Sequence, residues 1–236
     1  KIEMLFIVLL FWMINGWNNG LDLTPPMGWT NWNAFGCNYT ENTFIQQSSA
    51  LISLGLRDLG YEYVLIDECI AKERDSNGIL IPDPSRFPNG IPYLSSYLHN
   101  KSFKIGIYTD VGTKTCAGYV GSFNYEDIDA KTFAEWGIDY VKIDHCGKNP
   151  NSTQQELTQF SNYLNKTGRS MWVELCRGYG NPAPEWVPAI ANSWRVTGDH
   201  KDHWINTRNA IMEYAKGSAM VSGPYNWAYN DFLMTG

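Results

Sequence analysis

The sequence predicts a (β/α)8 TIM barrel, and three observations carry that prediction. Seven short apolar runs recur along the chain with amphipathic helical patterns between them, which is the alternation of a parallel sheet covered by helices. The 236 residues, 44% of them hydrophobic, suffice for one large core, and a single barrel of this kind takes about 250 residues. No Gly-x-Gly-x-x-Gly follows the first run, which disfavours an open dinucleotide-binding sheet.

Each predicted strand is a short apolar run rich in Val, Ile or aromatic residues, and each predicted helix shows amphipathic spacing. In chain order they are strand Met27–Trp29, helix Glu41–Leu54, strand Tyr63–Asp67, helix Pro92–Asn100, strand Ile105–Asp110, helix Tyr125–Trp136, strand Tyr140–Asp144, helix Gln154–Lys166, strand Met171–Leu175, a short proline-interrupted helix near Glu185, strand Trp194–Gly198, helix Trp204–Lys216 and strand Ala219–Gly223.

The last predicted strand ends about a dozen residues before Gly236, so an eighth strand and its helix do not fit. Seven strands would leave two unpaired edges facing each other. We therefore expect one barrel domain over residues 21–236, truncated after strand seven.

Residues 1–20 are predicted to be a signal peptide with an approximate end, because the apolar run Met4–Ile14 is too short to span a bilayer. No later segment is long and apolar enough to cross a membrane. Four Asn-x-Ser/Thr sequons agree with secretion and predict glycosylation at Asn38, Asn100, Asn151 and Asn165. We expect a protein of the secretory pathway, lysosomal or extracellular.

Charge and cysteine content narrow the class further. A formal net charge of −6 with only 18 Lys and Arg argues against a nucleic-acid partner. Five cysteines allow two disulfides and one leftover thiol. Each of two pairs lies just beyond neighbouring predicted strands, where loops from one face of a barrel meet, so we pair Cys37 with Cys69 and Cys116 with Cys146.

Two stretches place a cation shortly before an aspartate, two residues ahead in one and four residues ahead in the other. Lys142 precedes Asp144 and Arg195 precedes Thr197 and Asp199 on the same face of their strands. Buried charge is costly there unless that face lines a site. Two carboxylates at one end of a sheet can divide the work of acid and nucleophile, as in glycoside cleavage. The alternative is a pair of buried ion pairs that serves only the core.

Five motifs along the chain are specific. They are Pro25-Pro-Met-Gly-Trp-Thr-Asn-Trp32, Tyr61-Glu-Tyr-Val-Leu-Ile-Asp67, Lys104-Ile-Gly-Ile-Tyr-Thr-Asp110, Lys114-Thr-Cys-Ala-Gly118 and Asp127-Ile-Asp-Ala-Lys-Thr-Phe-Ala-Glu-Trp-Gly137. In these motifs, and in one register from about Leu23 to Gly236, the chain resembles the α-galactosidase and α-N-acetylgalactosaminidase family (glycoside hydrolase family twenty-seven). The resemblance implies a barrel followed by a C-terminal antiparallel β-domain, which this sequence lacks.

The resemblance also implies a retaining mechanism with Asp144 as nucleophile and Asp199 as general acid/base. Lys142 beside Asp144 would keep it ionised, whereas Asp199 needs a pKa raised by burial and by the neighbouring negative charge. The positions that match sugar-binding residues are Trp32, Asp67, Glu68, Tyr108, Lys142, Arg177, Arg195 and Asp231. No metal or organic cofactor is implied.

Three departures from the family pattern bear on specificity. Glu68 stands where the family usually has a second Asp, and its extra methylene narrows the pocket toward a sugar without an exocyclic hydroxymethyl group. Arg177 replaces a Glu in the loop that reads the 2-position substituent, next to Cys176, which we expect to be an unpaired thiol. Tyr229 replaces the Asp of the usual Trp-Asn-Asp after strand seven.

The sequence therefore predicts a retaining exo-glycosidase that releases terminal α-D-galactose from oligosaccharides, glycolipids or glycoproteins. A homodimer is a further expectation. The alternatives within the class are β-L-arabinopyranosidase and α-N-acetylgalactosaminidase. Two alternatives lie outside it: an inactive sugar-binding fragment, and a carbanion-forming barrel in which Asp67, Asp110 and Asp144 hold a divalent cation with Lys142 as base.

Overall fold

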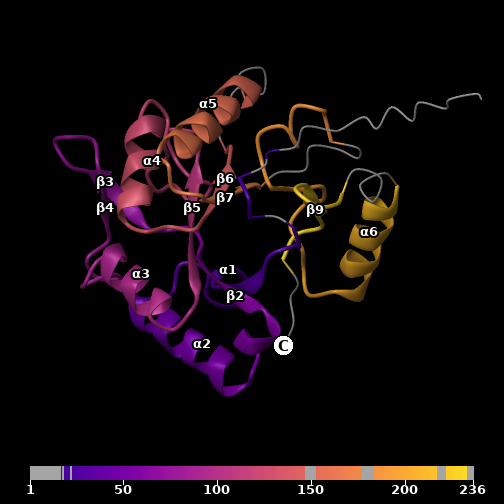
Figure 1. Cartoon of the computed structure of the whole chain (residues 1–236), viewed down its shortest axis with the longest axis horizontal. Coiled ribbons are helices and arrows are strands. Elements are labelled where there is room, and N and C mark those ends of the chain that lie inside the picture. Colours follow the sequence, from indigo (N-terminus) through magenta and orange to yellow (C-terminus); the bar gives the residue numbers. More distant parts are fainter. Residues whose placement is uncertain are drawn as a thin grey trace, which may run out of the picture.

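Seven parallel strands form one curled sheet, an open half-barrel, in the computed structural model (Figure 1). The model describes residues 17, 19–21, 23–146, 153–176, 183–216 and 222–232. The strands are β1 (Met27–Thr30), β2 (Tyr61–Ile66), β5 (Lys104–Asp110), β6 (Tyr140–Asp144), β7 (Trp172–Leu175), β8 (Ser193–Arg195) and β9 (Trp227–Tyr229). They are hydrogen-bonded in the order β1-β2-β5-β6-β7-β8-β9, so sequence neighbours are spatial neighbours. The barrel-type fold predicted from the sequence is confirmed.

The helices lie outside the sheet and complete the βα units (Figure 1). They are α1 (Trp32–Phe35), α2 (Glu41–Ser53), the 3-10 helix η1 (Arg57–Leu59), α3 (Ile91–His99), α4 (Glu126–Glu135), α5 (Thr153–Lys166) and α6 (Trp204–Ala215). The five long helices match the predicted ranges to within a residue at each end. A capping box formed by Thr40 and Thr43 starts α2, which satisfies backbone N–H groups that have no partner inside the helix.

The hydrophobic core has two layers, one on each face of the sheet. Side chains such as Val141 and Ile143 point outward and pack under the helices in the larger cluster. The smaller cluster fills the inside of the barrel with Tyr63, Leu65, Tyr140 and Trp172. The rings of Tyr140 and Trp172 are stacked, with centroids 6.0 Å apart. This inner layer fills the concave side of the sheet, and the polar residues of the site lie beyond it, toward the carboxyl ends of the strands.

Gly106 of β5 is required by this inner packing. A Cβ at that position would lie 2.5 Å from Cγ of Leu65 and 3.2 Å from Cβ of Tyr140. Any larger residue would therefore push β2 and β6 away from β5.

The seventh strand is not where the sequence predicted it. Residues 217–221 lie outside the described part, but the strand that pairs with β8 is Trp227–Tyr229, in place of the predicted Ala219–Gly223. Gly223 and Asn226 exchange two backbone hydrogen bonds and form the turn that precedes β9. The apolar Ala219–Val221 run and its glycine were mistaken for the strand itself. β9 has only three residues, too short a run to show a strand pattern.

Two further local predictions need correction. The segment near Glu185 forms turns rather than a helix, because Pro188 has no N–H for a helical hydrogen bond. A two-stranded antiparallel hairpin, β3 (Ala71–Arg74) with β4 (Leu80–Pro82), was not predicted. Its Arg74 makes a bidentate ion pair with the buried Asp129 of α4, at 2.6 and 2.7 Å, which fastens the hairpin to the outside of the barrel.

Both predicted disulfides are confirmed. Cys37 is bonded to Cys69 and Cys116 to Cys146, and Cys176 is a buried free thiol. The first bond joins the segments after β1 and β2, and the second joins those after β5 and β6. Both therefore brace the carboxyl-terminal edge of the sheet.

The surface agrees with several of the remaining expectations. Asn38, Asn100 and Asn165 are exposed, whereas Asn151 lies outside the described residues. The predicted signal peptide, residues 1–20, lies almost wholly outside them as well. Within the described residues, no helix has the length and apolar character needed to span a membrane.

Candidate active site

The carboxyl ends of β2, β5 and β6 bring acidic side chains to one edge of the sheet. Asp110 and Asp144 are direct partners in the β5–β6 register, and Asp67 follows the last residue of β2. Parallel strands must end at the same edge, so this gathering follows from the predicted topology. Asp67 and Asp144 were predicted from the sequence as site residues, whereas Asp110 was named only as a ligand in the divalent-cation alternative.

Asp144, the predicted nucleophile, is held by two donors. The Tyr108 hydroxyl donates to Oδ2 at 3.0 Å and the His145 N–H donates to Oδ1 at 2.9 Å. Sγ of Cys116 lies 3.4 Å from Oδ2. Burial raises the pKa of Asp144, while the His145 N–H, Lys142, Tyr108 and Arg195 all favour its charged form. The carboxylate therefore has a fixed direction and the cationic surroundings expected of a nucleophile.

Lys142 and Asp67 form a buried ion pair beside Asp144. Nζ of Lys142 lies 2.6 Å from Oδ2 of Asp67, and the two residues are 5% and 2% exposed. Burial lowers the pKa of Lys142, but Asp67, Cys176 and Glu174 together more than offset this, so the net pKa is raised. A lysine held as a cation is poorly suited to be a base and well suited to donate to sugar hydroxyls.

Asn31 orients Asp67 and was missed in the sequence analysis. The Asp67 N–H donates to Oδ1 of Asn31 at 2.8 Å, and Asn31 itself is fully buried between β1 and α1. The Glu68 N–H completes the arrangement by donating to Oδ1 of Asp67 at 2.9 Å. Asn31 stands inside the Gly-Trp-Thr-Asn-Trp motif next to Trp32, so its position in the motif was the available signal.

Glu68 points into the same region and does not rotate to the surface. Its Oε1 accepts from the Ala117 N–H at 3.0 Å, and the residue is 2% exposed. Burial raises the pKa of Glu68, and hydrogen bonds with Thr115, the Ala117 N–H and Tyr108 oppose that rise. The longer side chain therefore occupies space at the edge of the site.

Asp110 is the second residue whose role was not foreseen. It is fully buried and accepts from the backbone N–H groups of Gly112 and Cys146, the latter at 2.7 Å. Its pKa is raised to about 7: burial is the main cause, the two backbone N–H groups oppose the rise, and Asp144 and Glu68 add to it. Asp110 thereby joins the loop after β5 to the loop after β6, which carries Asp144.

Arg195 connects the remaining predicted residues. Its Nη1 donates to Oδ1 of Asp199 at 2.9 Å and to Oδ1 of Asp231 at 3.3 Å. Asp231 also accepts from the His200 N–H at 2.6 Å. The electrostatic effect of Arg195 on Asp144 links this group to the nucleophile.

Asp199 differs from the expectation in one respect. We expected a strand through Gly198 with a buried carboxyl at its end, but β8 ends at Arg195, so Asp199 lies four residues beyond it. Its side chain is 80% exposed. The burial that we expected at Asp199 is therefore not present in this arrangement, in which Arg195 holds the carboxylate.

The other predicted positions are placed as follows. Trp32 is partly exposed on α1, consistent with a platform at the rim. Tyr229 lies on β9, and its hydroxyl donates to the Glu174 carboxylate. Arg177 lies outside the described residues.

The divalent-cation alternative finds little support in the donor set. The described residues that could gather around one ion are Asp110, Asp144, Cys116 and Cys146. Both cysteines are joined in a disulfide and offer no thiolate. Asp67 is not in the group, and Lys142, the base required by that alternative, is bound to Asp67.

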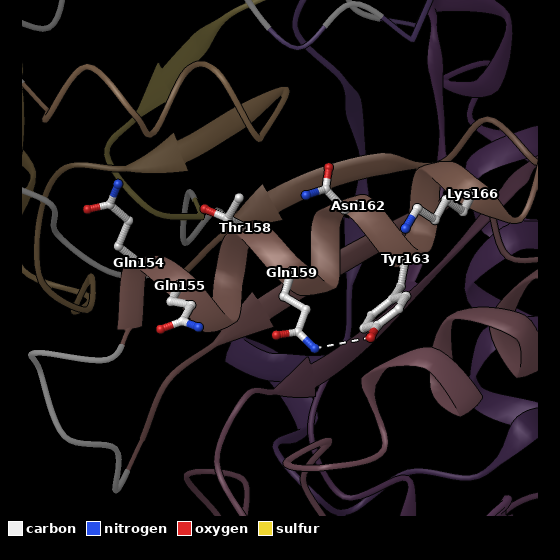
Figure 2. Close-up of a pocket in the computed structure, with 7 residues that line it drawn as sticks. All are labelled: Gln154, Gln155, Thr158, Gln159, Asn162, Tyr163 and Lys166. Carbon is white, nitrogen blue, oxygen red and sulfur yellow. Dashed lines mark hydrogen bonds between the residues drawn. The ribbon is translucent and has the colours of Figure 1, made fainter.

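A second concavity lies on the outer face of α5, away from the strand ends (Figure 2). It is an open hollow of about 540 Å³, and the polar side chains of Gln154, Gln159 and Tyr163 are among its lining residues. Nε2 of Gln159 donates to the Tyr163 hydroxyl at 3.1 Å. It contains no carboxylate among its lining residues, so it does not compete with the strand ends as a catalytic site.

The family model described as Alpha galactosidase A matches residues 24–236. The chain belongs to the alpha galactosidase A family. The protein of Dictyostelium discoideum named "Probable alpha-galactosidase" is 45% identical over 226 residues, which cover 94% of this chain and 58% of that protein.

Solved structures of the family agree. Alpha-galactosidase I from Mortierella vinacea superposes with a TM-score of 0.82 at 40% identity, covering 93% of this chain and 62% of that one. The alpha-galactosidase of Saccharomyces cerevisiae with raffinose gives 0.83 at 35% identity, covering 89% and 52%. The chain thus spans about half the length of the family members that it matches.

Proposed function

We propose that this family member is a retaining exo-glycosidase that hydrolyses terminal α-D-galactosides, with Asp144 as nucleophile and Asp199 as general acid/base. The observation that carries the proposal is the end of β6, where Asp144 accepts a hydrogen bond from Tyr108 and the charges of Lys142 and Arg195 favour its carboxylate form. Membership of the family supports the substrate class. Raffinose, present with the Saccharomyces cerevisiae relative, carries a terminal α-galactosyl group.

The reaction begins with attack of an Asp144 oxygen on the anomeric carbon of the galactosyl group. The bond to the leaving oxygen breaks as Asp199 donates a proton to that oxygen, and a covalent glycosyl-enzyme forms. Water then attacks the same carbon while Asp199 accepts its proton, which releases Asp144. Two inversions give net retention.

Asp199 must change partners for this chemistry. In this arrangement its carboxyl group is bound to Arg195, and it must leave that contact to donate a proton to the leaving oxygen. A retaining pair needs its carboxyl groups about 5–5.5 Å apart. We propose that substrate binding draws Arg195 onto a sugar hydroxyl and toward Asp231, so that Asp199 turns to the leaving oxygen and takes up a proton.

Sugar recognition is assigned to the buried donors and acceptors around Asp144. Asp67 accepts from ring hydroxyls while Lys142 and Arg195 donate to them. A sugar that lacks one of these hydroxyls would leave a buried polar group without its hydrogen-bond partner. The site would therefore bind such a sugar much more weakly. Trp32 would cover the apolar face of the ring. Tyr108 contacts the nucleophile itself.

The proposal is tested with a panel of nitrophenyl glycosides. α-D-Galactoside should be hydrolysed with the highest kcat/KM, and NMR of the first product should show the α-anomer. A first-formed β-anomer would contradict the double displacement. Turnover of no member of the panel would support the inactive sugar-binding alternative.

Glu68 favours β-L-arabinopyranosidase as a second candidate function. Its carboxylate is buried at the edge of the site in place of the shorter Asp of the family pattern. Arabinopyranose has the hydroxyl arrangement of galactose without the exocyclic carbon, so it fits a narrower pocket. A higher kcat/KM on the arabinopyranoside than on the galactoside would make this the principal activity.

We also propose that the protein matures in the secretory pathway. Two disulfides and three exposed sequon asparagines support this, because disulfides persist in oxidising compartments. A shift in electrophoretic mobility on treatment with an endoglycosidase would test it, and an unchanged mobility of the native protein would contradict it.

A further inference from the structure

A second carboxylate lies inside the barrel, beneath the site. Glu174 of β7 is fully buried, and both of its oxygens are bonded. The hydroxyl of Tyr140 on β6 donates to one oxygen and the hydroxyl of Tyr229 on β9 donates to the other. A buried carboxylate normally needs a cation or several donors, and two phenols are an incomplete substitute for water.

Lys142 supplies the missing cation. It is the direct partner of Glu174 in the β6–β7 register, so both side chains project from the same face of adjacent strands. Lys142 is attracted electrostatically by Asp67 and by Glu174. It also lies over the rings of Tyr108 and Phe232, 5.3 and 4.5 Å from their centroids. The ammonium group therefore binds Asp67, just beyond β2, and is attracted by Glu174 of β7.

Charged groups reach Glu174 from each neighbouring element. Burial raises its pKa; Lys142 of β6 and the hydroxyls of Tyr140 and Tyr229 lower it, and Asp67, beyond β2, raises it. Cys176, just past the end of β7, faces the same groups. Among these groups, Lys142 is the cation that stabilises the charged form of Glu174.

Tyr229 completes this arrangement. It stands where the family resemblance led us to expect an Asp, and its hydroxyl donates to Glu174 of β7. Glu174 and Tyr229 are therefore a hydrogen-bonded pair, and neither residue belongs to the motifs that carry the family resemblance.

We propose that Glu174 is a positioning residue for the hydrolysis: held by Tyr140 and Tyr229, it acts through Lys142 and fixes the ammonium group where Lys142 can bind both Asp67 and the sugar. This inference rests on the proposed function. Glu174 touches no reacting atom, and its effect on the reaction passes through substrate binding.

The test is to introduce Glu174→Gln into the full-length natural protein and to measure its steady-state kinetics on nitrophenyl α-galactoside beside the wild type. The amide keeps the shape and removes the charge. KM should rise about tenfold with kcat changed less than about threefold, since Lys142 contributes mainly to ground-state binding. Inactivity of the wild-type protein would refute the proposed function, whereas an active wild type with an unchanged KM in Glu174→Gln overturns only this inference.

A double-mutant cycle separates positioning from general structural damage. In a Lys142→Met background, Glu174→Gln should change KM no further, because its route to the substrate is gone. A full additional rise in KM there would overturn the proposal. Glu41→Gln is the matched control: Glu41 is a buried carboxylate on α2, bonded to Asn89 outside the barrel, and its variant should keep the wild-type KM.

Tyr229→Phe keeps the test decisive if the glutamine variant does not fold. It removes one donor to Glu174 without changing the packing of the ring. KM should rise threefold or more with kcat nearly constant. A Tyr229→Phe protein with wild-type KM overturns the proposal.

Discussion

At the scale of single residues, the site is organised by which carboxylates are paired and which are left to act. Asp67 is neutralised by Lys142, Asp110 is fixed by two backbone N–H groups, and Asp144 is held by Tyr108. Asp144 therefore has neighbouring cations but no direct ion pair in the described residues. This difference is consistent with the nucleophile role that we propose for Asp144.

Specificity should respond to Glu68. Glu68→Asp should shift the ratio of kcat/KM values toward α-galactosides over β-L-arabinopyranosides, because the shorter side chain frees space for the hydroxymethyl group. One methylene is worth roughly 1–3 kcal/mol of discrimination. The two specificity constants, measured side by side, give the ratio. An unchanged ratio would show that the Glu68 carboxylate does not border the sugar.

At the scale of elements, the strand ends were predictable and the segments beyond them were not. Lys142 and Asp144 share a face because strand side chains alternate, and β6 was predicted at its observed bounds. Asp199 lies in a loop beyond β8, where Arg195 donates to it. Arg195 also donates to Asp231, which comes from a distant part of the chain. Asp110 was named only as a metal ligand, because two backbone donors leave no trace in the sequence.

Asp110 should give the protein a specific dependence of stability on pH. Its pKa is raised to about 7 in the folded protein, from 3.8, so between these values the folded state binds the extra proton. The contribution of Asp110 to the free energy of unfolding is therefore present at low pH and is lost as pH rises from about 4 to 7.

Asp110→Asn should remove this contribution to the pH dependence of the free energy of unfolding. The amide accepts only one of the two N–H groups, so the variant should also be less stable, by about 1–3 kcal/mol. Urea unfolding of both proteins at several pH values between 4 and 8 gives the comparison. Parallel curves for the two proteins would show that Asp110 does not titrate in this range.

At the scale of the whole molecule, the open sheet and its two disulfides place every described site residue at one edge. The number of strands and their parallel order followed from the repeating pattern, and the disulfide pairs followed from the positions of the cysteines relative to the strands. The bounds of β9 did not, because a strand of three residues gains its stability from pairing with Arg195 and its neighbours rather than from its own composition.

Removal of divalent cations should leave the activity intact. The proposed mechanism needs only two carboxylates. Among the described residues, the group that could hold a metal ion is Asp110, Cys116, Asp144 and Cys146, and its two cysteines are joined in a disulfide. Hydrolysis of nitrophenyl α-galactoside is measured before and after dialysis against EDTA. A loss of turnover that magnesium or another divalent ion restores would favour the cation-binding barrel.

The assignment of Asp144 as nucleophile is the central claim, and azide rescue of Asp144→Ala tests it most directly. The variant is supplied with an activated α-galactoside and sodium azide, and the configuration of the galactosyl azide is determined by NMR. The account predicts the β-azide, because azide replaces the missing carboxylate and only one inversion occurs. The α-azide would show that the nucleophile is still in place and that Asp144 has another role.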